Sequence, residues 1–128
     1  MKYIVLVGRV LYSYIFVTSA LGHFSQHTIE YAASKGLPMA AVLVPLAGAM
    51  ALVGGVSILI GWNARWGAWL LVLFLLPVTI VIHKFWGISD PMAAQMQKVM
   101  FMKNISMLGA ALLIAYFGSG PFSIDGEK

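Results

Sequence analysis

The sequence contains no cysteine. This absence excludes disulfide bonds, thiolate ligands for metal ions and any relay of paired thiols. Carboxylates are scarce as well, because only 4 aspartate and glutamate residues occur among 128 residues. Together with 3 histidines they make a poor ligand set for a closed metal site, and we expect no bound metal. Any chemistry must therefore use other side chains or a bound cofactor.

Charge of either sign is also rare. Charged residues make up 9% of the chain, whereas hydrophobic residues make up 61% and the mean hydropathy is +0.91. Soluble domains contain about 25% charged residues on average. The net charge of +4 is spread singly, without the basic runs that bind nucleic acid, so we expect no nucleic-acid partner. The composition predicts a protein whose main surroundings are the lipid bilayer.

Four stretches are long and apolar enough to cross a membrane, which takes about 20 residues of helix. They cover about residues 3–22, 38–62, 66–83 and 98–118. Only three residues, Asn63–Arg65, separate the second stretch from the third, which predicts an antiparallel hairpin with Trp62 and Trp66 at the headgroup level. The sequence thus predicts one all-α domain over residues 1–128, a membrane-embedded antiparallel four-helix bundle followed by a short polar tail from Ser119.

The connection between the first two spans carries helix signals of its own. A cap at Ser25 or Thr28 and a terminating Gly36 predict a short interfacial helix within about Ser25–Gly36. Four spans place both termini on one face of the membrane and the first and third connections on the other. Lysine and arginine are divided evenly between the two faces, so the orientation stays open.

Several polar residues are expected near the face opposite the termini. They are His23, His83, Lys84, Asp90, Lys103 and Asn104. Counting 1.5 Å per residue from Gly118, Lys103 lies about 22 Å into a core of about 30 Å. A lysine beside an amide at that depth needs partners, which indicates a functional role. His83 and Lys84 have a simpler explanation as well, because cations interact favourably with the end of a helix and Lys84 can extend to the headgroups.

We predict a ligand pocket at this face. Its polar groups are His83, Lys103 and Asn104, its apolar walls are Trp86 and Phe101, Asp90 lies near its mouth, and His23 belongs to the same region. A haem between His23 and His83 is also conceivable in a four-helix bundle. Arg9 is separate, about 9 Å into the membrane from the terminal face. It either extends to the surface or binds an anionic headgroup.

Five stretches between about Ser34 and Asp125 carry a resemblance to a known family. In order they read "SKGLP", "GGVSILIGWNARWGA", "IHKFW", "FMKNISMLGAALL" and "GSGPFSID". With these motifs the chain resembles the DoxX family of small four-helix membrane proteins, and "FMKN…LG" is the most specific element. One departure weakens any transfer of acid–base chemistry: relatives often have a carboxylate before the Gly-Gly of the second span, where Ala51 stands here.

The resemblance implies a link to quinones. Relatives include the small quinone-reactive subunit of a thiosulfate:quinone oxidoreductase and proteins associated with quinone detoxification or defence against oxidative stress. A quinone ring needs a flat apolar slot, and its carbonyls need hydrogen-bond donors. The slot would come from Phe85, Trp86, Phe101 and Met102, and the donors from His83, Lys103 or Asn104.

The chain has no second redox centre, so we do not expect it to be active alone. A soluble or membrane redox partner would then be required, and further copies of the chain are a second candidate partner. The alternative is a non-enzymatic membrane protein that binds lipid or scaffolds a partner, with Arg9 and Lys103 holding anionic headgroups. In either case we expect an integral protein of a bacterial or archaeal plasma membrane.

Overall fold

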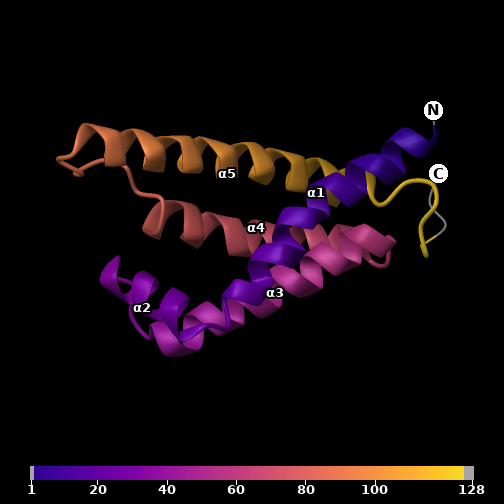
Figure 1. Ribbon diagram of the computed structural model, residues 1–128. Coiled ribbons are helices and arrows are strands. Elements are labelled where there is room, and N and C mark those ends of the chain that lie inside the picture. The colour runs from indigo at the N-terminus through magenta and orange to yellow at the C-terminus, as the bar shows by residue number, and fades with distance from the viewer. Residues whose placement is uncertain (1, 126–128) are drawn as a thin grey trace.

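The computed structural model describes residues 2–125, and every regular element in that range is a helix (Figure 1). The helices are α1 (Lys2–Gly22), α2 (Gln26–Ser34), α3 (Ala40–Ile60), α4 (Ala64–Val81) and α5 (Pro91–Phe117). All except α2 are long and apolar enough to cross a membrane. The predicted all-α membrane bundle is therefore confirmed, and α2 lies within the range predicted for an interfacial helix.

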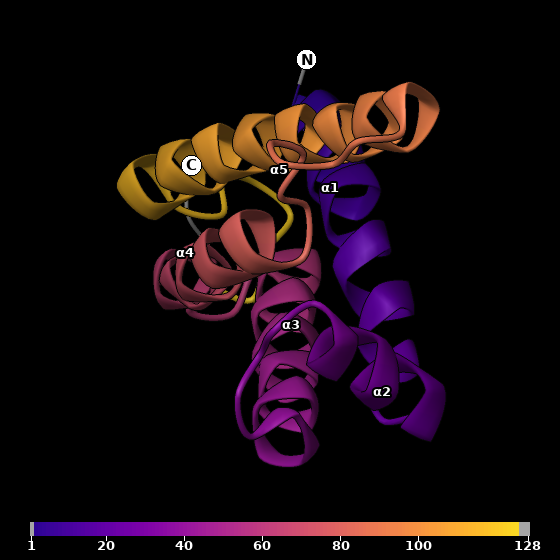
Figure 2. The ribbon, with the colours of Figure 1, turned by 90° about the vertical axis from the view of Figure 1, so that its left-hand side faces the viewer.

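The helix α3 lies at the centre of the packing. It contacts α1, α2 and α4, while α4 also packs against α5 (Figure 2). A hydrogen bond also joins α1 to α5, because the Tyr12 hydroxyl donates to the Met107 carbonyl at 2.6 Å. Both termini and the α3–α4 turn lie at one end of the bundle, and α2 and the α4–α5 connection lie at the other (Figure 1). This arrangement agrees with the predicted antiparallel topology.

Glycine allows α3 and α4 to approach closely near the terminal end. A Cβ added at Gly54 would lie 2.8 Å from the Gly67 carbonyl oxygen, and one added at Gly67 would lie 2.5 Å from Ser57 Oγ. On another face of α3, a Cβ at Gly55 would lie 3.1 Å from Phe16 Cβ in α1. Van der Waals contact between backbones is a main source of helix association in lipid, so these small residues hold the bundle together at this end.

The helix α5 begins at Pro91, earlier than the predicted start near residue 98. The Asp90 carboxylate accepts a hydrogen bond from the Ala93 amide at 3.3 Å, and a proline is favoured in the first turn of a helix. The predicted start was late because apolarity marks only the part of a helix that lies in the membrane core. The capping residues begin the helix earlier, outside that core. With 27 residues, α5 is about 40 Å long and exceeds a hydrocarbon core of about 30 Å.

The C-terminal segment, residues 118–125, is a folded part of the structure rather than a simple polar tail. The amides of Ile124 and Asp125 donate to the carbonyls of Ile60 and Gly61 at 3.1 and 2.9 Å. Beneath it, Arg9 is only 4% exposed, and its guanidinium donates to the Pro121 and Phe122 carbonyls. Backbone carbonyls thus take the place of the headgroup or surface water predicted as the partner of Arg9.

Gly61 offers a test of this closed end. It has a φ of +72°, and a Cβ there would overlap both Ser123 and the Arg9 guanidinium. We expect Gly61→Ala to lower the free energy of unfolding by more than about 1 kcal/mol, because the backbone is left-handed and the site is full. Gly109→Ala is the matched control, since nothing lies within 4 Å of its added Cβ. Thermal unfolding in detergent should show a lower midpoint for Gly61→Ala alone, and equal midpoints would contradict the packing.

Candidate functional site

A cavity of about 280 Å³ is lined partly by α2 and by the segment after α4, which lie at the end of the bundle away from the termini (Figure 1). All five helices contribute to its lining, which is mainly apolar. The polar side chains around it are Ser19, His23, Thr28, Tyr31, His83, Lys103 and Asn104. Apolar walls with a few polar groups are typical of sites that bind small organic molecules.

Four of the predicted site residues line this cavity: His23, His83, Lys103 and Asn104. They come from the end of α1, the segment after α4 and the middle of α5, so residues distant in sequence meet at one depth. Lys103 is exposed, and its Nζ lies 3.6 Å from Met100 Sδ, a weak acceptor. Its ammonium is therefore held only weakly by the protein.

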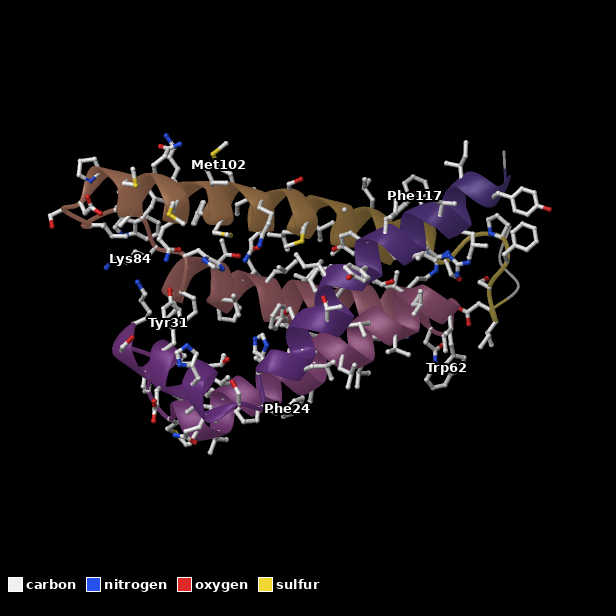
Figure 3. The ribbon with its side chains drawn as sticks, viewed as in Figure 1. Phe24, Tyr31, Trp62, Lys84, Met102 and Phe117 are labelled. Carbon is white, nitrogen blue, oxygen red and sulfur yellow. The ribbon has the colours of Figure 1, made fainter. Side chains whose placement is uncertain are left out.

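The predicted aromatic walls lie elsewhere. Trp86 and Phe101 do not line the cavity but pack edge to face against each other and against Phe85, with ring centroids 5.3–5.8 Å apart. Aromatic rings favour this geometry, which explains why they form their own cluster. Met102 is 58% exposed and points away from the bundle (Figure 3). The walls are formed instead by residues such as Phe16, Phe74 and Met107.

Two of the predicted residues, Asp90 and His23, have contacts within the protein that indicate structural roles. Asp90 caps α5 through the Ala93 amide and does not line the cavity. His23 lines the cavity, but its Nδ1 lies 2.8 Å from the Ser19 carbonyl and its ring packs against Phe74 at 5.5 Å. Within residues 2–125, no group of three or more metal-ligating side chains comes together.

A short hydrogen-bond chain orients His83. Gln97 Nε2 donates to the Tyr31 hydroxyl at 3.3 Å, so Gln97 Oε1 faces His83 Nδ1 at 3.0 Å and accepts a hydrogen bond from its N–H group. This leaves His83 Nε2 as an acceptor in the neutral ring. Sequence reasoning missed Gln97 and Tyr31. The signal for Gln97 was its spacing of seven from Asn104, which puts both on one face of α5.

Its surroundings keep His83 neutral. Burial lowers its pKa below the ordinary value, and the charges of Lys103 and Lys35 lower it further. The hydrogen bond with Gln97 raises the pKa and opposes this effect only in part. The neutral ring is thus the favoured form in the folded protein.

Asn104 is the most unusual member of the site. It is only 4% exposed and lines the cavity, yet its side chain makes no hydrogen bond within the described part of the chain. Its polar atoms are not among the enclosed side-chain atoms that lack a partner, so they face the open space of the cavity. The amide is therefore available to a molecule in the cavity, as donor and as acceptor.

Comparison with known proteins identifies the family. The family profile described as DoxX matches residues 4–84, more than half of the chain. The chain belongs to the DoxX family. It is 32% identical to the inner membrane protein YqjF of Escherichia coli over 123 residues, which cover 94% of this chain and 88% of YqjF. It is also 32% identical to the inner membrane protein YphA of the same species over 98 residues, 77% of this chain and 69% of YphA.

The comparisons differ in how much of the cavity lining they include. The profile match ends at residue 84, before α5 and its "FMKN" motif, whereas the similarity to YqjF includes α5. A Surfeit locus protein 4 homolog of Schizosaccharomyces pombe is 27% identical over 98% of this chain, which covers 38% of that protein. No solved structure matches. With four spans and inner membrane relatives, this DoxX protein is an integral protein of the bacterial plasma membrane, as predicted.

The lowered pKa of His83 predicts a pH dependence. Below about 6.5 the unfolded chain binds a proton at this histidine more readily than the folded protein does. Stability should therefore fall as the pH drops from about 6.5 towards the lower folded pKa, and His83→Gln should reduce this fall. Thermal unfolding at pH 7.5 and 5.5 measures it, with His27→Gln as the control because His27 is exposed and outside the cavity. The same pH dependence in wild type and His83→Gln would refute the assignment.

Proposed function

We propose that this DoxX protein binds a quinone in the cavity and acts as the quinone-handling subunit or accessory of an oxidoreductase. The observation that carries the proposal is the buried Asn104 amide without a hydrogen bond, on the wall of an apolar cavity. An apolar pocket alone would suit many lipids. A buried amide beside a neutral histidine suits a flat ring that carries oxygen atoms.

The groups around the cavity fit both forms of such a ring. The Asn104 amide and the Lys103 ammonium are donors for quinone carbonyls. His83 Nε2 is an acceptor in the neutral ring, so it suits the hydroxyl of the reduced form rather than the carbonyl of the oxidised one. This assigns His83 a different part from the donor role expected from the sequence.

A bound quinone would supply two-electron, two-proton redox chemistry. The protein's own contribution is to hold the ring and to provide a proton acceptor at His83 Nε2, whose pKa is kept low by burial and by two lysines. Gln97 and Tyr31 fix the orientation of this imidazole. Because the chain has no cysteine for a relay of paired thiols, we expect the electrons to pass to or from a soluble or membrane partner with a flavin or another redox group.

A second function is favoured by the charge at this end of the bundle. Lys103 and Lys35 lie close enough to act electrostatically on His83, and both are exposed. Two lysines near a cavity mouth would also attract an anionic lipid headgroup. A non-enzymatic lipid-binding protein is therefore the alternative.

The substitution Asn104→Leu tests whether Asn104 binds a ligand or supports the folded structure. Replacing an unsatisfied buried amide by an apolar side chain of similar size should leave the ligand-free protein equally stable or more stable. The same change should weaken quinone binding about tenfold, the effect of one buried hydrogen bond. Thermal shift titrated with a 1,4-benzoquinone measures both quantities, and Ser106→Ala on an exposed position of α5 is the control. Loss of stability without any loss of binding would contradict the proposal.

Lys103 and Lys84 offer a matched pair of substitutions at this end of the bundle. Lys103 lines the cavity, whereas the exposed Lys84 does not, although each carries one charge. We expect Lys103→Ala to weaken quinone binding about threefold to tenfold through loss of one donor, and Lys84→Ala to leave it unchanged. Native mass spectrometry of the same samples tests the alternative. Anionic phospholipid retained by wild type and lost from Lys103→Ala, with no quinone effect, would favour lipid binding.

A further inference from the structure

A groove of about 160 Å³ adjoins the cavity between α3 and α4. Its lining is apolar throughout: Leu37, Leu43, Leu46, Ala47, Met50, Leu73, Phe74, Pro77, Val78, Val81 and Ile82. Without a donor or acceptor side chain, the groove cannot recognise a polar head. It suits a hydrocarbon chain.

The groove and the cavity share a wall. Six residues line both of them: Leu37, Leu43, Ala47, Phe74, Val78 and Ile82. The shared residues come from α3, from α4 and from the connections before α3 and after α4, so only their side chains separate the two spaces. The cavity, at about 280 Å³, is slightly smaller than the usual range of about 300–1,000 Å³ for sites that hold a whole drug-sized ligand.

The other side of the groove faces the lipid. Leu46 in α3 and Leu73 in α4 are 53% and 59% exposed, and both belong to helices that span the membrane. The polar groups of the site, by contrast, lie on the cavity side of the shared wall. The groove therefore lies between the bilayer and the cavity that holds Asn104 and His83, with the six shared side chains as the partition.

We infer that the ligand is a lipid-soluble quinone with a long apolar tail, which enters sideways from the bilayer and leaves its tail in the α3–α4 groove. The inference rests on the proposed function and specifies its substrate class. The ring lies in the cavity near Asn104, and the chain passes along the shared wall to Leu46 and Leu73. A water-soluble quinone would use the ring site alone.

The test compares one ring with and without a tail. Isothermal titration calorimetry on the purified full chain in detergent gives the Kd of a tailless 1,4-benzoquinone and of the same ring carrying a decyl chain. For each variant, the Kd of the tailless ring is divided by the Kd of the tailed ring. The decyl chain partitions into detergent equally with every variant, so a change in this ratio between variants reports binding of the tail in the groove. Leu73→Trp and Leu46→Trp fill the groove from its two sides at exposed positions. Leu76→Trp is the control, because Leu76 is 42% exposed on α4 but outside the groove.

We expect Leu73→Trp and Leu46→Trp to reduce the preference for the tailed ring at least about fivefold, equivalent to one or two methylene groups no longer buried. Binding of the tailless ring should not change, and Leu76→Trp should behave as wild type. An unaltered preference in both groove variants, with the tailless ring still bound, would overturn this inference alone. An equal loss in Leu76→Trp would overturn it as well. If neither ring binds to wild type, the proposed function fails, and this inference fails with it.

Discussion

The close approach of α3 to its neighbours is the contact on which the rest of the structure depends. At the terminal end, Gly54 and Gly67 let the backbones of α3 and α4 meet, and Gly55 lets α1 approach from another side. Towards the opposite end, α3 and α5 diverge towards α2 (Figure 1). There Gly48 still lets α3 approach the end of α1, because an added Cβ would lie 2.5 Å from His23 Cβ. Backbone packing, rather than water exclusion, brings helices together in lipid, so these small residues hold α3 to its neighbours at both ends.

The two ends of the bundle differ in the hydrogen bonds that their buried polar side chains make. At the terminal end, the C-terminal segment covers Arg9, and the backbone carbonyls of Pro121 and Phe122 accept from its guanidinium. Two carbonyls thus accept from Arg9, although its Nε and Nη1 have no hydrogen-bond partner in the described structure. At the other end, the Asn104 side chain makes no hydrogen bond within the described chain, and it lines a cavity. The amide at that end is therefore open to a ligand.

Much of the fold could be predicted from the sequence, because a span needs only length and apolarity, and a cap such as Ser25 is a local signal. The meeting of His83, Lys103 and Asn104 at one depth could also be predicted, since the alternation of antiparallel helices decides it. Depth does not determine direction around a helix axis, however. Trp86 and Phe101 have the right depth, but they face each other and Phe85 instead of the cavity. The partners of Arg9 were beyond prediction for a related reason, because they are backbone atoms of a segment more than a hundred residues away.

The Asn104 amide is the strongest argument that the cavity is functional. An apolar residue at this position would need no polar partner, whereas the amide makes no hydrogen bond to the described chain and faces the cavity. Burial and two nearby lysines lower the pKa of His83, which favours the neutral ring with Nε2 as an acceptor. The Asn104 side chain makes no hydrogen bond within residues 2–125, and Gln97 contacts only Nδ1 of His83. A molecule that offers an oxygen atom to Asn104 and a hydroxyl group to His83 would bind both, and the apolar groove between α3 and α4 lies between their cavity and the bilayer from which such a molecule would come.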